Sequence, residues 1–430
     1  MSTTTDLHIL IYPFPTSGHI IPFLDLTNQL LTRSGLYVTV LVTPQNLPLL
    51  DPLLAAHPSS LQSLVLPPPE FSNPKQNRLF AIIQSMRQLH YPLLLQWFQS
   101  HPSPPVAIIS DFFLGWTHQL GSQLRVPRLV FSPSGAFALS ITHLYRQGKK
   151  GDPDWDFIGE NFIANMACWG IVFNSFSELE RVYFNYLKQE LGHDRVFAVG
   201  PALPPPEDED VGQANRGGSS SVPCHEVLSW LNDRPDDSVV YICFGSRTVL
   251  TSKQMEVLTA ALEISGVHFI LSVREPDERH VGDDHGVIPD GFEDRVGGRG
   301  FVIRGWAPQV SILRHRAVGG FMTHCGWNSV LEGLSAGAVM LTWPMGADQY
   351  TNAKLLVDQL GVAIRGGEGT ENIPESSELA QKFVDSVDAI RPERVRAREL
   401  RDAALGSVKG GGSSNKELDE LVKQLRELKS

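Results

Sequence analysis

Short apolar runs alternate with amphipathic stretches along most of the chain, and this alternation restricts its fold more than any other feature. In the first half, residues 7–12, 37–42 and 170–173 are continuous apolar runs typical of buried strands. Residues 20–31 and 79–98 have the periodicity of amphipathic helices. Strands rich in β-branched residues that alternate with helices predict a parallel sheet with helices on both faces, an α/β fold.

The composition changes abruptly between residues 201 and 223. This stretch holds three consecutive prolines, an acidic run at 207–210 and a Gly/Ser-rich run at 217–221, which together are typical of a solvated linker. The alternation then resumes, so we predict two facing, doubly wound Rossmann-like domains with an inter-domain cleft at the carboxyl ends of their strands. The predicted parts are 1–205, an N-terminal domain; 206–223, the linker; 224–410, a second domain; and 411–430, a C-terminal helix that packs back across the domains.

The formal net charge is -11, and lysine and arginine are not clustered. A nucleic-acid groove is therefore not expected, and a phosphate-bearing ligand would be held by local dipoles and hydrogen bonds. Cys168, Cys224, Cys243 and Cys325 are far apart, which argues against a disulfide scaffold or a zinc site. The polar N-terminus leads directly into a strand pattern, and no apolar run approaches the ~20 residues that span a bilayer. We expect a cytoplasmic monomer that does not insert into membranes.

The most informative segment runs from residue 306 to 349. Residues 320–323 are typical of a strand, 324–328 of a sharp turn, and 329–334 of the first turns of a helix. A helix N-terminus preceded by glycine presents unpaired N–H groups and a positive dipole end, which form an anion site. Trp306 offers a flat ring for a base, and Glu332 can accept hydrogen bonds from ribose hydroxyls. The segment therefore predicts a site for a nucleoside diphosphate.

This segment resembles the signature of the plant family 1 UDP-glycosyltransferases, which have two Rossmann-like domains in the GT-B architecture. The resemblance is carried by Trp306-Ala307-Pro308-Gln309, His324-Cys325-Gly326-Trp327-Asn328-Ser329, Glu332 and Asp348-Gln349, and it extends to Phe244-Gly245-Ser246 and the N-terminal Pro-x-x-Gly-His. It implies a UDP-sugar donor. The implied contacts are uracil on Trp306 and Gln309; ribose on Glu332; phosphates on His324, Asn328, Ser329 and Ser246; and sugar on Trp327, Asp348 and Gln349, with Ala307 and Gly326 completing the set.

Two residues of the first half are candidates for catalysis. His19 follows the first strand, and Asp111 ends the strand predicted at 106–110, so both lie at the carboxyl edge of one sheet. Sugar transfer to a hydroxyl needs a general base, and histidine titrates near neutrality. A carboxylate on the other ring nitrogen orients such a base and stabilises the imidazolium. Alone, His19 could be a turn residue and Asp111 a helix cap, but the resemblance implies that they act as base and partner in an inverting displacement. His118 is a rival base within a helical pattern.

The acceptor is expected in the first domain. The candidates for its wall are Phe14, Phe112, Phe113, Trp116, Phe131, Ser134 and Tyr145, although packing in the core would explain each of them at least as well. An aromatic, weakly charged wall suits a flat phenol such as a flavonoid or stilbene, and the resemblance also points to phenolic acceptors. Segments near 67–77 and 144–156 are short for the family, either because the acceptor site is more open or because mobile segments are absent from the sequence.

The donor sugar and the activity have alternatives. In the family, a closing glutamine such as Gln349 favours UDP-glucose over UDP-rhamnose, UDP-xylose, UDP-galactose or UDP-glucuronate. A non-catalytic sugar-nucleotide-binding protein could share the fold, but His19 and Asp111 favour an enzyme. A metal-dependent transferase would place an Asp-x-Asp motif after a buried strand, whereas Asp152-Pro153-Asp154 and Asp208-Glu209-Asp210 do not follow one. We therefore expect neither a metal nor a cofactor.

Overall fold

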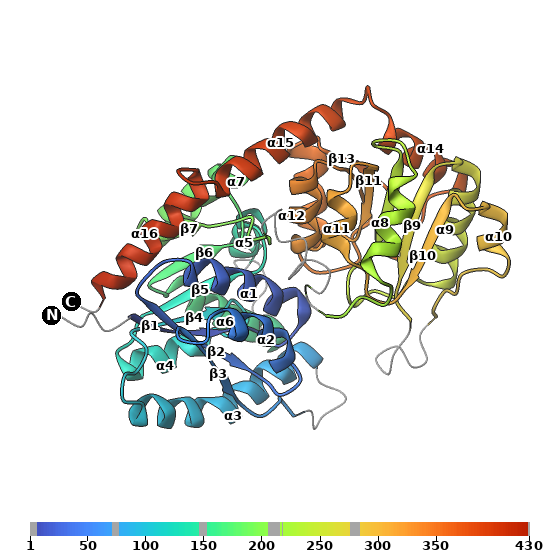
Figure 1. The fold of residues 1–430 in the computed structure, drawn as a ribbon. Coiled ribbons are helices and arrows are strands. Elements are labelled where there is room, and N and C mark those ends of the chain that lie inside the picture. The colour runs from blue at the N-terminus through green and yellow to red at the C-terminus, as the bar shows by residue number, and fades with distance from the viewer. Residues whose placement is uncertain are drawn as a thin grey trace. The chain divides into compact units, whose positions relative to one another are not determined.

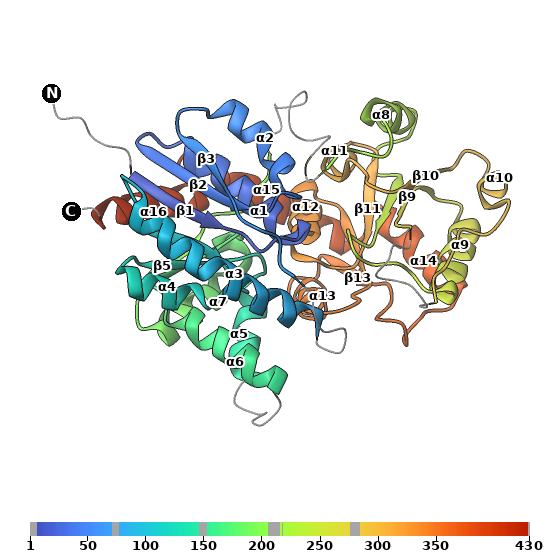
Figure 2. The same cartoon turned by 90° about the horizontal axis from the view of Figure 1, so that it is seen from below.

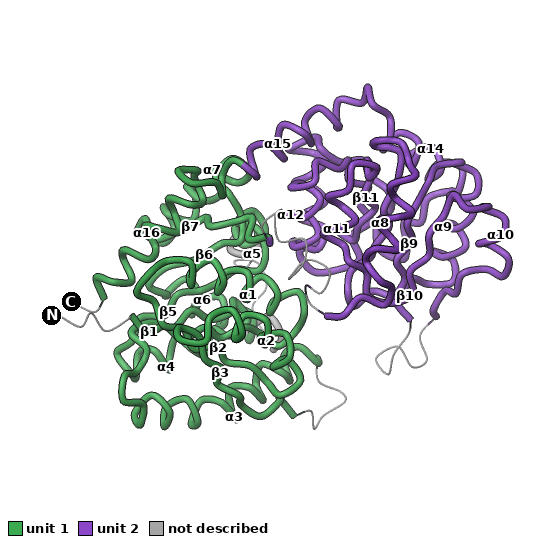
Figure 3. Tube along the Cα trace, viewed as in Figure 1, with its two compact units in different colours: residues 1–203, 406–430 green, residues 204–405 purple. Residues whose placement is uncertain are grey.

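The structure, a computed structural model, describes residues 7–70, 77–145, 153–204, 216, 218–275 and 284–428, with only the backbone described at 142–145 and 153–156. It divides into two compact units (Figure 3): residues 1–203 with 406–430, and residues 204–405. The predicted boundaries at 205 and 410 lie beside these divisions, and the second division falls within one helix, α15 (Pro392–Val408).

The first unit is built on a parallel sheet with the strand order β3-β2-β1-β4-β5-β6-β7 (Figure 1). Its strands are β1 Leu7–Tyr12, β2 Leu36–Val42, β3 Leu61–Val65, β4 Ala107–Asp111, β5 Arg128–Ser132, β6 Gly170–Phe173 and β7 Val196–Ala198. Its helices are α1 Ser17–Leu31, α2 Leu47–Ala56, α3 Arg78–Ser100, α4 Thr117–Leu124, α5 Ala136–Tyr145, α6 Pro153–Met166, α7 Ser177–Leu191 and α16 Ser413–Glu427.

Helices cover both faces of this sheet (Figures 1 and 2). On one face, Leu10 of β1 and Ile108 of β4 pack with Met86 of α3. On the other face, Phe23 of α1 lies 4.4 Å from Phe131 of β5, centroid to centroid. Helix α16 packs against the edge strand β7 of this unit.

The second unit repeats the plan with the strand order β10-β9-β8-β11-β12-β13. Its strands are β8 Val239–Cys243, β9 His268–Val273, β10 Gly300–Arg304, β11 Val318–Thr323, β12 Val339–Thr342 and β13 Ala363–Arg365. Its helices are α8 Cys224–Asn232, α9 Ser252–Ser265, α10 Phe292–Val296, α11 Gln309–Arg314, α12 Trp327–Ala336, α13 Gln349–Lys354 with the π-helical turn η2 Leu355–Gln359, α14 Ser376–Val387, and most of α15.

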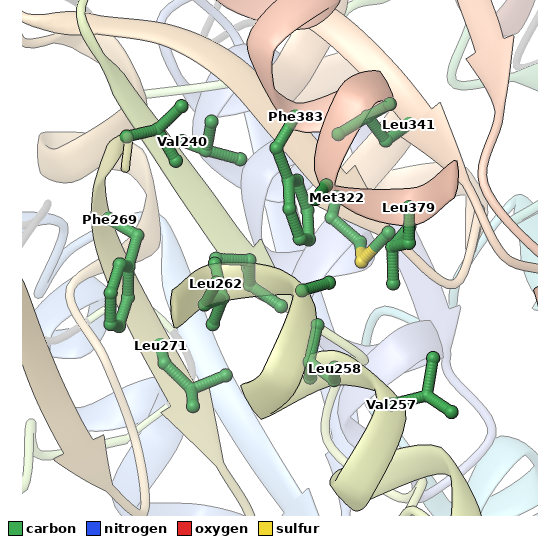
Figure 4. Close-up of a cluster of buried hydrophobic side chains, with 14 of the residues drawn as sticks. Val240, Val257, Leu258, Leu262, Phe269, Leu271, Met322, Leu341, Leu379 and Phe383 are labelled. Atoms are coloured by element: carbon green, nitrogen blue, oxygen red, sulfur yellow. The ribbon is translucent and has the colours of Figure 1, made fainter. Parts of the chain in front are cut away.

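One face of the second sheet is closed by α9 and α14 (Figure 4). Leu258 and Leu262 of α9 and Phe383 of α14 pack onto Val240 of β8 and Met322 of β11, and all five are buried. Full burial of side chains of this size contributes roughly 1.5–3 kcal/mol each. The two parallel sheets confirm the predicted α/β fold with two doubly wound domains.

Candidate active site

The predicted residues gather where each sheet reverses its strand order. In the first sheet this point lies between β1 and β4, and His19 and Asp111 follow or end these strands. In the second sheet it lies between β8 and β11, whose ends lead to Ser246 and His324. Open α/β sheets bind ligands at such switch points, so each unit places its candidate residues at the edge suited to a ligand.

His19 and Asp111 form a hydrogen bond in the first unit. The distance from His19 Nδ1 to Asp111 Oδ2 is 2.8 Å, and Asp111 Oδ1 accepts the Phe113 N–H at 2.9 Å. The Asp111 side chain is fully buried, whereas that of His19 is 18% exposed. An ionised carboxylate can only accept a hydrogen bond, so with Asp111 in that form Nδ1 is the donor and Nε2 of a neutral ring keeps its lone pair. His19 lies in the first turn of α1 and not before the helix as predicted, because α1 begins at Ser17.

Two aromatic side chains predicted for the acceptor site pack against the imidazole of His19, and the other candidates for which contacts are given lie elsewhere. Phe113 lies 4.8 Å from the imidazole and Phe14 lies 5.4 Å from it, centroid to centroid. Trp116 instead packs edge-on against Tyr12 at 5.8 Å and is buried in the core. Phe112, which packs against Phe113, and Ser134, which precedes α5, are half-buried. The rival base His118 lies in α4, where burial and the charge of Arg128 lower its pKa, and the hydrogen bond to Asp111 is made by His19.

The turn between β11 and α12 holds the half-buried imidazole of His324 against two glycines. A Cβ on Gly245 would lie 2.4 Å from His324 Nε2, and one on Gly326 would lie 2.6 Å from the same atom. Burial lowers the pKa of His324 to about 4, so the ring is neutral near pH 7, and among the described residues its Nδ1 has no hydrogen-bond partner. Cys325 adopts a φ of +64°, a strained conformation of the kind that recurs at functional sites.

Helix α12 begins at Trp327, two residues earlier than predicted. The backbone N–H groups of its first turn, which include those of Asn328 and Ser329, have no intrahelical acceptor. The dipole of this helix places its positive end beside His324. A helix N-terminus that follows such a turn is suited to binding an anion, which is the role that the sequence predicts for this segment.

Gln309, Ser329 and Glu332, all predicted for the UDP-sugar site, lie together in one hydrogen-bond network. Gln309 Nε2 donates to Glu332 Oε2 at 2.5 Å and lies 3.2 Å from Ser329 Oγ, while Tyr241 donates to Gln309 Oε1 at 3.2 Å. Glu332 is buried on the inner side of α12. The structure thus joins α11, α12 and β8 in one hydrogen-bond network.

Two arginines that the sequence interpretation missed lie in the same region. Arg216 Nη1 donates to Glu332 Oε1 in an ion pair whose side chains are 10% and 5% exposed. Arg274, just after β9, donates to the carbonyl of Ser246 at 2.9 Å, and its guanidinium lies 5.7 Å from the Trp306 ring centroid. The position of Arg274 after a strand was a usable signal. Arg216, in a Gly/Ser-rich stretch and 116 residues from Glu332, gave none.

Helix α13 brings the closing residues of the signature to the same turn. Gln349 Oε1 accepts the N–H groups of Met345 and Gly346 at 2.8 and 2.9 Å, which leaves the amide nitrogen as the group that a ligand can use. Asn352 bridges the Asp348 carboxylate and the Cys325 carbonyl at 3.0 and 2.9 Å. Trp327 and Ala307 are buried, whereas Trp306 is half-buried.

The Asp-x-Asp motifs cannot be placed, because Asp152, Asp208 and Asp210 lie outside the described residues and the side chain of Asp154 is not described. Over the ranges that the structure covers, no cluster of three or more His, Cys, Asp or Glu side chains is arranged to hold a metal ion. Within the same ranges, no helix combines the length and the apolar character that crossing a membrane requires.

Comparison with known proteins identifies relatives along nearly the whole chain. Residues 206–370 match the family described as UDP-glucoronosyl and UDP-glucosyl transferase. A flavonol 3-O-glucosyltransferase of Arabidopsis thaliana is 47% identical, over 98% of this chain and 96% of the relative. A flavonol 7-O-rhamnosyltransferase of the same plant is 41% identical, over 99% of both. The crystal structure of Arabidopsis thaliana UGT89C1 complexed with UDP-L-rhamnose matches with a TM-score of 0.84 at 39% identity, over 98% of this chain and 99% of that one.

Proposed function

Because the chain belongs to the family of UDP-glycosyltransferases, we propose that it transfers glucose from UDP-glucose to a hydroxyl of a flavonol or related flat phenol, with inversion at the anomeric carbon. The observation that carries the proposal is the 2.8 Å hydrogen bond between His19 and Asp111. It supports a histidine base that is held in one tautomer by a buried carboxylate.

In the proposed donor site, the second unit holds UDP-glucose at the carboxyl ends of β8 and β11. Uracil stacks on Trp306 beside Gln309, and the ribose hydroxyls donate to Glu332. The neutral His324 and the N-terminal amides of α12 donate to the phosphates, which suits an acidic protein because hydrogen bonds and a helix dipole need no cluster of lysines. Asp348 and the amide nitrogen of Gln349 bind the glucose hydroxyls. Trp327, Asn328, Ser329, Ser246, Ala307 and Gly326 complete the proposed donor site.

In the proposed reaction, the acceptor hydroxyl gives its proton to His19 Nε2 while its oxygen forms a bond to C1 of the glucose. The bond from C1 to the phosphate oxygen breaks in the same displacement, and UDP leaves with the electron pair. Asp111 stabilises the imidazolium until the proton passes to water. The α12 amides stabilise the charge on the departing UDP.

The phenolic acceptor is supported by two observations. Phe14 and Phe113 place aromatic rings within 5.4 Å of the His19 ring, and such a wall favours a flat, apolar acceptor. The names of two relatives refer to flavonols, and another structure of UGT89C1 contains quercetin.

The purified chain tests the proposal when UDP-glucose, UDP-rhamnose, UDP-xylose, UDP-galactose and UDP-glucuronate are each paired with flavonols, stilbenes and simple phenols. Mass spectrometry of the products should show a glucoside of a phenol. Transfer only from UDP-rhamnose would favour the alternative that the 41% identical rhamnosyltransferase suggests. UDP binding without any product would favour the non-catalytic alternative.

The catalytic pair has its own test in the same assay. His19→Ala should abolish product formation without changing the Kd for UDP. Asp111→Asn should lower kcat by up to about 10⁴-fold, as loss of the orienting carboxylate does in a Ser-His-Asp triad. His118→Ala is the matched control, and it should retain activity. Product formation by His19→Ala would show that another group is the base.

A further inference from the structure

A buried arginine lies behind the end of the strand that carries Asp111. Arg128 is the first residue of β5, pairs in register with Ile108 of β4, and is only 2% exposed. Its side chain runs along β4 towards the carboxyl end. Nε donates to Ser110 Oγ at 2.8 Å, and Nη2 donates to the Asp111 carbonyl at 3.3 Å. Nη2 also donates to Asn165 Oδ1 of α6 at 2.9 Å.

The guanidinium and the imidazole lie on opposite faces of the sheet. Successive side chains of a strand point to opposite faces. Ser110 hydrogen bonds to Thr117 of α4 at 2.8 Å, whereas Asp111 hydrogen bonds to His19 of α1. Arg128 shares the face of Ser110, so its guanidinium lies behind the strand end whose other face presents the carboxylate and the base.

The candidate counter-charge for this buried cation is the carboxylate of Asp111, whose main-chain carbonyl the guanidinium contacts. Burial lowers the pKa of Arg128 to about 10, so the group is charged at neutral pH. Cys168 and Asp111 are the two groups whose ionised forms would raise the pKa of Arg128. Burial raises the pKa of the Cys168 thiol, which donates to the Gly170 carbonyl at 3.1 Å and is therefore neutral. The imidazole of His118 on α4 also faces the guanidinium, and burial and the charge of Arg128 lower its pKa. Asp111 is fully buried and requires an opposite charge.

We propose that Arg128 is a positioning residue for the transfer reaction, because its positive charge balances Asp111 and opposes uptake of a proton by the His19–Asp111 pair. This inference rests on the proposed role of His19 as the base. The direction of the effect of Arg128 on proton uptake does not depend on which of the two residues holds the proton, because a nearby cation disfavours the protonated pair in either case. Without the cation, the pair takes up a proton at higher pH, and a protonated pair cannot accept the proton of the acceptor.

The test is the pH dependence of kcat for Arg128→Gln and Arg128→Lys with saturating substrates. Arg128→Gln should shift the acid limb of the profile to higher pH by about one unit. Its kcat should therefore be about tenfold lower than that of the wild type below the limb, with a much smaller difference above it. Arg128→Lys keeps the charge and should leave the limb in place. The KM for UDP-glucose should not change, because Arg128 and the proposed donor site belong to different units.

Arg394 offers a matched control, because it is a buried arginine of the second unit that pairs with Asp237 at 2.9 Å. Arg394→Gln removes a buried positive charge far along the chain from the catalytic pair, and it should not move the acid limb. An unmoved limb in Arg128→Gln, or an equal loss of kcat at every pH, would overturn the proposal.

A double variant keeps the proposal testable if Arg128→Gln fails to fold. If the two charges compensate, adding Asp111→Asn should restore folding, seen as a cooperative urea transition, because no uncompensated charge then stays buried. If Arg128→Gln does fold, the double variant should be more stable to urea than Arg128→Gln alone. A double variant that stays unfolded, or losses of stability that add, would refute the pairing. His19→Ala distinguishes failure of the proposed base from failure of the role of Arg128. Activity in His19→Ala would overturn the proposed base. An inactive His19→Ala together with an unmoved acid limb in Arg128→Gln would overturn only the role of Arg128.

Discussion

The half-buried imidazole of His324 should make the stability of the second unit depend on pH. Burial lowers its pKa to about 4 in the folded protein, compared with 6.5 for an unperturbed histidine. Between these values the unfolded chain binds a proton that the folded chain does not bind, so the free energy of unfolding decreases as the pH falls from about 6.5 towards 4. The stabilisation from neutral His324 is fully present above pH 6.5 and is lost on acidification.

The size of the effect follows from the two pKa values. Their difference of about 2.5 corresponds to roughly 3.4 kcal/mol at the acid limit. At pH 5, where the unfolded chain is almost fully protonated at this site and the folded chain is not, the loss is roughly 2 kcal/mol relative to pH 7.5. His324→Gln removes the titrating group, so the difference in stability between the wild type and this variant should change by about 2 kcal/mol between the two pH values.

Hydrogen exchange of the amides of β11, read by mass spectrometry and corrected for intrinsic rates, reports the opening free energy of this unit. Other groups titrate equally in the wild type and in His324→Gln, so their contributions cancel in the comparison. His225→Gln, at an exposed position of α8, is the matched control and should lose stability in parallel with the wild type. If the wild type and His324→Gln also lose the same free energy of unfolding between pH 7.5 and 5, the inference that folding lowers the pKa of His324 is refuted.

Two further predictions concern donor binding, with the Kd for UDP from calorimetry as the measurement. Glu332→Gln removes the ionised acceptor proposed for the ribose hydroxyls, so the Kd should rise about 10–100-fold, while Glu293→Gln, at an exposed ion pair with Arg304, should leave it unchanged. Gly245→Ala should weaken UDP binding about tenfold or more, because φ is +78° and the new Cβ would displace His324. Gly266→Ala is the control, because φ is +68° and nothing lies within 4 Å of the new Cβ. It should lower the free energy of unfolding by about 1–2 kcal/mol without changing the Kd. Equal Kd values for the two glycine variants would contradict the inferred contact between position 245 and His324.

The sequence predicts the central strands of both sheets and misses most of the edges. The runs predicted at 7–12 and 170–173 coincide with β1 and β6, because both faces of these interior strands are buried and nearly every residue of each run is apolar. Strands β3, β7 and β13 were not predicted. All three lie at sheet edges and are five residues or shorter, so their side chains need not form a continuous apolar run.

The site was predictable where its residues share one local segment. The turn at 324–326 and the helix that carries Glu332 are encoded within about ten residues, so their chemistry could be interpreted from spacing. Arg128 and Arg216 contribute through long side chains whose partners lie elsewhere in the chain, 17 residues away for the Asp111 carbonyl and 116 for Glu332. Such contacts depend on the register of β4 with β5 and on the path of the linker, and neither is encoded in a motif.

The net charge of -11 predicts that local dipoles and hydrogen bonds, and not a cluster of cations, hold a phosphate. The ion pair of Arg216 with Glu332 indicates that one cation can still matter beside such a site, whatever the net charge of the protein. Glu332 accepts one hydrogen bond at each oxygen, from Arg216 and from Gln309. A carboxylate has about four lone-pair sites, so the proposed hydrogen bonds from ribose hydroxyls can form while both partners remain. A bare carboxylate one helical turn from the proposed phosphate site would repel the diphosphate, whereas a carboxylate paired with Arg216 is neutral as a unit and keeps its capacity to accept. A single arginine can thus make a ribose acceptor compatible with an adjacent anion site, although the protein as a whole is acidic.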